Sequence, residues 1–220
     1  MRHAVAMTLV RDTPQYAAVL RAEIPGLLVI DNASVYPIDD AWMRIPCQRY
    51  FSGGWNRAME DMHLRRNCPA WIWMLNSDVS GVSQAMMDEL VAIAESENAY
   101  VVSPRVQSSQ WPQMRAPHLY ETDFVDWVAP LVNLEWFITN GGFDERFCGH
   151  GSDLDLCFRT LQDKKLVAGN LQVQHPYGGT TKLLNDKTMY QTEDVRRGLH
   201  MKHGAAIIGF AAAYFGSWRP

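Results

Sequence analysis

The apolar run from Ala70 to Leu75 constrains the fold of this chain more than any other segment. It is short, continuous and rich in tryptophan, which is typical of a strand buried on both faces of a sheet. The sequence then turns polar with Asn76, Ser77 and Asp78. Ligands of open α/β sheets bind beyond the carboxyl ends of the strands, where a carboxylate can hold a divalent cation. The alternative is that Asp78 only caps the following helix.

Two further buried strands are predicted over residues 3–10 and 27–30, with a helix starting at Pro14 between them. Two buried strands joined by a helix form a βαβ unit, so they should pair in parallel. The second of these strands also ends in polar residues, Asp31 and Asn32. Polar groups are therefore expected at one edge of a parallel sheet.

The remaining periodic segments predict further alternation of strands and helices. We expect strands at residues 45–51, 99–102, 124–132 and 166–174. We expect one helix that ends before residue 69, others that begin near residues 83, 135 and 185, and one that runs from residue 152 to about residue 164. Pro104 should break the strand before it, and residues 105–124 read as a long ordered loop. The overall pattern predicts an α/β fold with a mostly parallel sheet.

Composition excludes several classes of protein. A hydrophobic content of 47% with 20% charged residues is that of a globular chain and not of a disordered one. The net charge of −4 gives no overall attraction to nucleic acid or anionic membranes, although it leaves room for a local basic patch. No apolar run reaches the roughly 18–20 residues that span a bilayer. The four cysteines form no C-x-x-C pair, so we expect reduced thiols in a cytoplasmic protein.

Six short motifs follow one another in a characteristic order. They are Asp31-Asn32-Ala33-Ser34, Gly53-Gly54-Trp55-Asn56, Leu75-Asn76-Ser77-Asp78, Gly141-Gly142-Phe143-Asp144-Glu145-Arg146-Phe147, the run from Gly151 to Arg159, and His175 followed by Gly178-Gly179. In this order they resemble the family 2 glycosyltransferases, over residues 3–181. The resemblance implies a GT-A (Rossmann-like) fold, a three-layer sandwich around a mostly parallel sheet. It further implies a nucleotide-sugar half over about 1–103, an acceptor half over about 104–181, and a helical extension at 182–220.

The resemblance implies a metal site. Asp78 is similar to the last residue of the family's D-x-D motif, which anchors the metal and the ribose-phosphate, while Asn76 replaces the first. His175 matches the family's histidine after the last strand, a second metal ligand, although it could also be a core or turn histidine. A divalent cation neutralises the charge that develops on a diphosphate leaving group. Because Mg²⁺ prefers oxygen ligands, the histidine favours Mn²⁺.

The same resemblance implies a nucleotide site. Asp31 and Asn32 stand where the family reads the nucleobase, and Thr8 is similar to a further base contact. Asn56 matches a donor-site asparagine of the family. An asparagine side chain both donates and accepts, which suits the edge of uracil or thymine and favours a UDP- or dTDP-sugar. Each of these residues could instead be a turn or cap residue.

For catalysis the resemblance implies inversion of the anomeric centre, with Asp153 as the base that deprotonates the acceptor hydroxyl. Ser152 replaces the glutamate that most relatives carry beside this aspartate. Gly151, Ser152, Trp127 and Trp136 are expected on the acceptor side, although the tryptophans could also be core residues.

Several charged residues after residue 154 each have two interpretations. Asp155 is expected to cap its helix or to pair with Arg159 four residues on. Arg196, Arg197 and Lys202 belong to a basic run that either forms a solvated helix face or contacts phosphate.

The leading hypothesis is a metal-dependent inverting glycosyltransferase that acts on a saccharide or a lipid-linked saccharide. A phage-type DNA glycosyltransferase acting on 5-hydroxymethylated pyrimidine is the alternative. A non-catalytic nucleotide-sugar-binding module is a more remote one. A nucleotidyltransferase is disfavoured, because no glycine-rich phosphate loop with a lysine follows the first strand. We expect the protein in the cytoplasm, at the membrane periphery, or in the cytoplasm of a phage-infected host.

Overall fold

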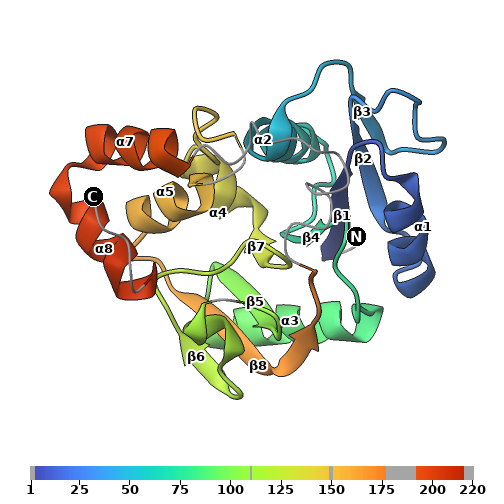
Figure 1. Ribbon diagram of the computed structural model, residues 1–220. Coiled ribbons are helices and arrows are strands. Elements are labelled where there is room, and N and C mark those ends of the chain that lie inside the picture. The colour runs from blue at the N-terminus through green and yellow to red at the C-terminus, as the bar shows by residue number, and fades with distance from the viewer. Residues whose placement is uncertain (1–2, 110, 149–150, 177–191, 216–220) are drawn as a thin grey trace.

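The computed structural model describes residues 3–109, 111–148, 151–176 and 192–215. Its strands form one eight-stranded sheet in the order β3-β2-β1-β4-β7-β5-β8-β6 (Figure 1). The strands are β1 (Ala4–Val10), β2 (Leu28–Asn32), β3 (Met43–Ile45), β4 (Trp71–Asn76), β5 (Val101–Val106), β6 (Leu119–Glu121), β7 (Leu131–Asn133) and β8 (Lys165–Val173).

The sheet is mostly parallel, as the sequence predicts. β1, β2, β3 and β4 pair in parallel with their neighbours, and so do β5 and β8. β7 is antiparallel to both β4 and β5 and lies between them, and β6 is antiparallel to β8. The predicted βαβ unit is confirmed, because β1 and β2 pair in parallel across the first helix.

Helices cover both faces of this sheet, which gives three layers (Figure 1). They are α1 (Pro14–Glu23), α2 (Tyr50–His63), α3 (Gln84–Glu97), the short 3₁₀ helix η1 (Pro112–Arg115), α4 (Leu134–Thr139), α5 (Ser152–Arg159), α7 (Thr192–His203) and α8 (Ala205–Phe215). α2 packs on β1, β2 and α4. α1 and α3 lie together on the other face, where the Glu23 carboxylate accepts a hydrogen bond from the Val82 amide.

Several predicted boundaries are wrong. The strand expected at 45–51 is β3 at Met43–Ile45, and α2 has already begun at Tyr50. Pro104 does not end its strand, because β5 continues to Val106 with a shift of register after the proline. Such an irregularity accommodates a residue that has no backbone N–H to donate.

Three other segments are shorter or more ordered than expected. Of the segment 124–132 only residues 131 and 132 belong to a strand, β7, and α5 ends at Arg159 instead of near residue 164. Residues 105–124 contain η1 and β6, with Met114 fully buried. The helix expected from 185 is described from Thr192 onward, and residues 185–191 lie outside the described part of the chain.

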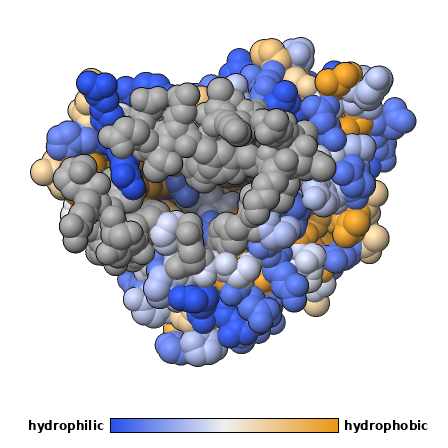
Figure 2. Space-filling model, in the orientation of Figure 1, coloured by the Kyte–Doolittle hydropathy of each residue, from blue (hydrophilic) through white to orange (hydrophobic). Residues whose placement is uncertain are grey.

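One continuous hydrophobic core joins the sheet to the helices on its two faces. Trp73 is fully buried in β4, and its indole N–H donates to the Ala129 carbonyl at 2.8 Å. On the face drawn in Figure 2, the described residues are mostly hydrophilic and the apolar ones form small separate patches. Among the described helices, none has the length and apolar character needed to cross a membrane.

Candidate functional site

The register of the sheet brings the polar strand ends together at one edge. Leu9 of β1 lies opposite Asn76 of β4, and Val10 lies opposite Asp31 of β2. Thr8 is one residue further back on β1, between β2 and β4. β2 and β4 therefore end in predicted donor-site residues, and Thr8 lies between these strands, two residues before the end of β1.

Asp78 and His175 form a buried pair at this edge. The carboxylate Oδ1 of Asp78 lies 3.0 Å from Nε2 of His175, and the two side chains are only 5% and 8% exposed. Two backbone hydrogen bonds between Ser80 and Gln174, each 3.0 Å long, join the loop after β4 to the end of β8. The Ser108 hydroxyl donates to the His175 carbonyl at 2.6 Å and fixes this turn from a third side. The pair therefore results from three chain segments that are distant in sequence.

The chemistry of this pair fits a divalent cation. Adjacent ligands of an octahedral ion with bonds of about 2.1 Å are about 3 Å apart, which agrees with the separation of the Asp78 and His175 atoms. The Asn76 side-chain amide approaches the same imidazole nitrogen, with Nδ2 at 3.4 Å from Nε2. Within the described ranges no cluster of three or more His, Cys, Asp or Glu side chains could hold a metal. Asp78 and His175 would therefore hold an ion together with ligand or water oxygens.

Asp31 organises the loop after β2. Its carboxylate is fully buried and accepts hydrogen bonds from the backbone amides of Ser34 and Ile38 and from the Arg44 guanidinium. Arg44 also donates to the Ser34 carbonyl at 2.9 Å. The Arg44 contact was not predicted, because it depends on the pairing of β2 with β3, which places Asp31 opposite Arg44. Asp31 therefore shapes the rim of the site while its side chain is already engaged.

Asn32 is engaged in a comparable way. Its Nδ2 donates to the Tyr50 carbonyl at 2.9 Å, and its Oδ1 accepts from the Arg49 amide at 3.1 Å. These two bonds attach the end of β2 to the start of α2. Thr8 differs, because its hydroxyl is fully buried and has no hydrogen-bond partner within the described part of the chain. An orphaned buried hydroxyl at a strand end is suited to a polar ligand group.

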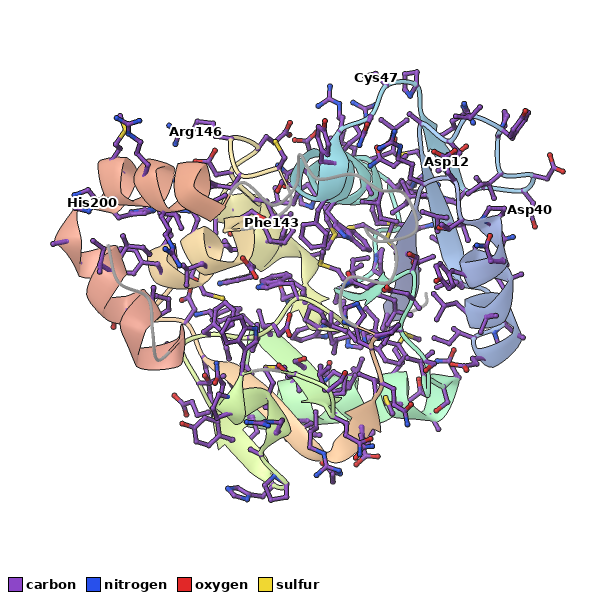
Figure 3. The ribbon with its side chains drawn as sticks, viewed as in Figure 1. Asp12, Asp40, Cys47, Phe143, Arg146 and His200 are labelled. Carbon is purple, nitrogen blue, oxygen red and sulfur yellow. The ribbon has the colours of Figure 1, made fainter. Side chains whose placement is uncertain are left out.

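Asn56 fixes the segment of α2 against the loop before α5. Its amide donates to the Phe143 carbonyl at 2.8 Å and accepts from the Phe143 amide at 2.9 Å. Phe143 points into the interior between α2 and α4, where its ring packs 4.9 Å from that of Trp127 (Figure 3). Gly142 has φ +60°, and a Cβ there would lie 2.6 Å from the Asn56 Oδ1. The structure therefore favours glycine at this position, because both the backbone angle and the limited space oppose a side chain.

Hydrogen bonds to the start of α2 anchor the segment that leads into α5. The Cys148 carbonyl accepts from the amides of Phe51 and Ser52, and the Ser52 hydroxyl donates to the Phe147 carbonyl. α5 begins four residues after Cys148, with Asp153 half-buried in its first turn. The Asp153 carboxylate accepts from the Leu154 amide at 2.8 Å.

The predicted pair of Asp155 and Arg159 is confirmed, with a distance of 2.8 Å. Burial of Asp155 raises its pKa, but hydrogen bonds from Lys202, His203 and Arg159 outweigh this effect and hold the pKa below its ordinary value. Lys202 also binds Asp144 at 2.8 Å. These contacts favour a structural role for Lys202 over a phosphate contact, because its ammonium group is already held by two carboxylates.

Two other residues of the basic run remain at the surface of α7. Arg197 is exposed and Arg196 is half-buried.

The residues expected on the acceptor side are mostly buried. Gly151 has φ +86° and packs against Val195 of α7, and Ser152 is 1% exposed. Trp127 and Trp136 are 4% and 5% exposed, which leaves their rings almost no surface for stacking on a ligand. The indole of Trp136 donates to Asp163 at 2.8 Å. The structure therefore favours the alternative prediction, in which both tryptophans pack in the core.

Comparisons with known proteins find solved structures of similar fold but no relative by sequence. No family model matches the chain, and no curated protein matches it. Among solved structures it is similar to GalNAc-T7 in complex with UDP, GalNAc and Mn²⁺, with a TM-score of 0.62, 10% identity, and coverage of 80% of this chain and 44% of that one.

Two further structures have similar scores. TarS of S. aureus matches with a TM-score of 0.59 and 9% identity, over 80% of this chain and 60% of that one. The mannosyltransferase PcManGT of Pyrobaculum calidifontis, in complex with GDP-Man and Mn²⁺, matches with a TM-score of 0.59 and 13% identity, over 97% and 76%. The chain thus spans 44% of the GalNAc-T7 chain and 60% of the TarS chain. The fold expected from the motifs, a GT-A fold, is confirmed.

Proposed function

We propose that this protein is a metal-dependent glycosyltransferase that transfers a sugar from a nucleoside diphosphate sugar to an acceptor hydroxyl. The observation that carries the proposal is the buried pair of Asp78 and His175, 3.0 Å apart at the carboxyl edge of a GT-A sheet. This pair would hold a divalent cation, and Mn²⁺ suits the mixed oxygen and nitrogen ligands better than Mg²⁺. When bound, the cation would act as a Lewis acid that stabilises the departing diphosphate.

The donor is proposed to be a UDP-sugar, with a dTDP-sugar as the alternative. Thr8 would contact the base with its buried hydroxyl, while Asp31 and Asn32 would shape the rim. Asn76 would contact the donor beside Asp78. Among the similar structures, GalNAc-T7 is in complex with UDP and PcManGT with GDP-Man, and both ligands contain a nucleoside diphosphate.

Asp153 is the proposed catalytic base of an inverting reaction. Its carboxylate takes the proton of the acceptor hydroxyl while that oxygen forms a bond to the anomeric carbon. The bond from the anomeric carbon to the diphosphate oxygen breaks at the same time, and the nucleoside diphosphate leaves. A half-buried carboxylate at the start of a helix is suited to this role, because the helix N-terminus favours its ionised form.

We propose a saccharide or a lipid-linked saccharide as the acceptor. DNA with 5-hydroxymethylated pyrimidine is less favoured, because Lys202 binds two carboxylates and leaves fewer cations free for phosphates. We also propose that residues 1–103 bind the donor and 104–181 the acceptor, with Gly151 and Ser152 on the acceptor side. Trp127 and Trp136 are not proposed as acceptor contacts, because both rings are buried.

The proposal is tested by release of nucleoside diphosphate from UDP-, dTDP- and GDP-sugars with Mn²⁺, Mg²⁺ or EDTA. We expect metal-dependent release that Asp153→Asn abolishes, while UDP still binds. Asp88→Asn, on the exposed face of α3, is the matched control and should behave as the native chain does. UDP binding without metal and without turnover of any donor would instead indicate a non-catalytic module. Stimulation of release by 5-hydroxymethylpyrimidine DNA, and by no saccharide, would make the DNA the acceptor.

A further inference from the structure

One fully buried carboxylate, that of Asp155, connects α5 to α7. Asp155 Oδ1 lies 2.6 Å from both the Lys202 ammonium and the His203 Nε2, and its Oδ2 accepts from the Arg159 Nε at 2.8 Å. Arg159 belongs to the same helix, α5, whereas Lys202 and His203 are in α7. A carboxylate with no exposed surface is stable only while such partners are present.

Arg159 also binds the loop before α5. Its two terminal nitrogens donate to the carbonyls of Asn140 and Gly142. The next residue, Phe143, is the one that Asn56 of α2 holds by two hydrogen bonds. The guanidinium therefore connects α5 to the loop that packs against the donor-side helix α2.

α7 makes further contacts with the same region. Lys202 binds the Asp144 carboxylate, whose other partner is Arg146. Gly151, at the start of α5, packs so closely on α7 that a Cβ there would lie 2.5 Å from Val195 Cγ1. Gly198 of α7 likewise packs on the Phe147 ring. α7 thus supports both ends of the segment that leads to Asp153.

We propose that Asp155, with the Lys202 ammonium as its counter-charge and His203 as a hydrogen-bond partner from α7, is a positioning residue that fixes the first turn of α5 and with it Asp153. This inference rests on the proposed function, in which Asp153 is the base. It also revises the expected organisation, because α7 becomes an integral part of the acceptor half and not an appendage beyond residue 181.

The physical reason is the cost of leaving a charge buried without a partner. Replacing Lys202 by an apolar residue leaves Asp155 and Asp144 close together with fewer cations, so α5 has to move or open. A displacement of about 1 Å at a catalytic group can reduce turnover by about a hundredfold. Donor binding should be unaffected, because the residues proposed to bind the donor lie on β1, β2 and β4 and not on α5 or α7. They are Thr8, Asp31, Asn32 and Asn76.

The first test compares Lys202→Met, Lys202→Arg and His203→Gln, with Lys164→Met as the control. Lys164 forms a surface ion pair with Glu97 of α3. We expect Lys202→Met to lower kcat at least about tenfold with unchanged KM for the donor. Lys202→Arg should recover most of the loss, and His203→Gln should have a smaller effect. Equal loss in the methionine and arginine variants, or a rise in donor KM alone, would overturn the proposal.

Hydrogen exchange tests the same idea without turnover. In Lys202→Met, amides of residues 151–157 and 140–146 should exchange faster than in the native chain, while those of α3 remain unchanged. If the native chain transfers no sugar, the proposed function fails, yet this exchange pattern still supports or contradicts the positioning role. Where Lys202→Met does not fold, the same comparison is made with His203→Gln. Unchanged exchange at the start of α5 in the folded variant would overturn the proposal.

Discussion

The carboxylate of Asp78 and the imidazole of His175 are 97 positions apart in the chain, yet their Oδ1 and Nε2 atoms lie 3.0 Å apart. Asp78 follows β4 and His175 follows β8, and these two strands are not neighbours in the sheet. The backbone bonds between Ser80 and Gln174 close the distance. This pair is the geometric basis of the proposed metal site.

Removal of the imidazole should weaken metal binding. In His175→Ala we expect the affinity for Mn²⁺, measured by calorimetry with saturating UDP, to fall by at least about tenfold. The reason is the loss of one of two protein ligands. His118→Ala is the control, because His118 is exposed and lies before β6. Equal Mn²⁺ affinity in both variants would contradict the assignment of His175.

Two adjacent glycines should differ in their tolerance of alanine. Gly142→Ala combines a φ of +60° with a Cβ only 2.6 Å from Asn56 Oδ1, whereas Gly141 has φ +74° and no atom within 4 Å of its Cβ. We expect Gly141→Ala to reduce the free energy of unfolding by about 1 kcal/mol through backbone strain alone. Gly142→Ala should cost about 2–3 kcal/mol, because Asn56 must also move. Urea denaturation measures the free energy of unfolding of both variants. Equal losses would show that Asn56 moves away from the new Cβ at no cost.

Acid should weaken the contact between α5 and α7. The pKa of Asp144 is held well below its ordinary value by hydrogen bonds from Arg146 and Lys202, and the pKa of Asp155 is also lowered. Groups with a lowered folded-state pKa stabilise the fold above their unfolded pKa of about 3.9 and lose this contribution as pH falls through the folded value.

The native chain should therefore lose stability below about pH 4, and Asp155→Asn should lose less over that range from a lower stability at pH 7. Urea midpoints between about pH 7 and pH 3 test this expectation. Asp88→Asn serves as the control with the native slope. A slope in Asp155→Asn that equals the native one would contradict it.

The cysteines should differ in their reactivity. All four are free thiols in the structure, with Cys157 buried and Cys47 exposed. Burial raises the pKa of the Cys157 thiol to about 11, so little thiolate forms at neutral pH. Iodoacetamide should therefore label Cys47 readily and Cys157 only after denaturation, as mass spectrometry of peptides would record. Rapid labelling of Cys157 in the folded protein would contradict the structure.

The sequence determined the class of fold and the residues that end its central strands. Short apolar runs such as Ala70–Leu75 favour buried strands, and a helix between two such strands favours a parallel pairing. Ser83 was identified as a helix start, and its hydroxyl does accept from the Met86 amide. The i to i+4 spacing of Asp155 and Arg159 likewise predicted their ion pair. All of these depend on local periodicity or on a few neighbouring residues.

Only the tertiary structure decided which of those polar residues are engaged by other parts of the chain. Asp31 meets Arg44 through the register of β2 and β3, and Asp155 meets Lys202 from 47 positions away. No local pattern encodes such contacts, because they depend on how strands and helices pack. For the same reason, the sequence predicted a strand at residues 45–51 instead of at β3, and it left open whether Trp127 is a core residue. The sequence shows which groups are present, whereas packing determines which of them remain available to a ligand.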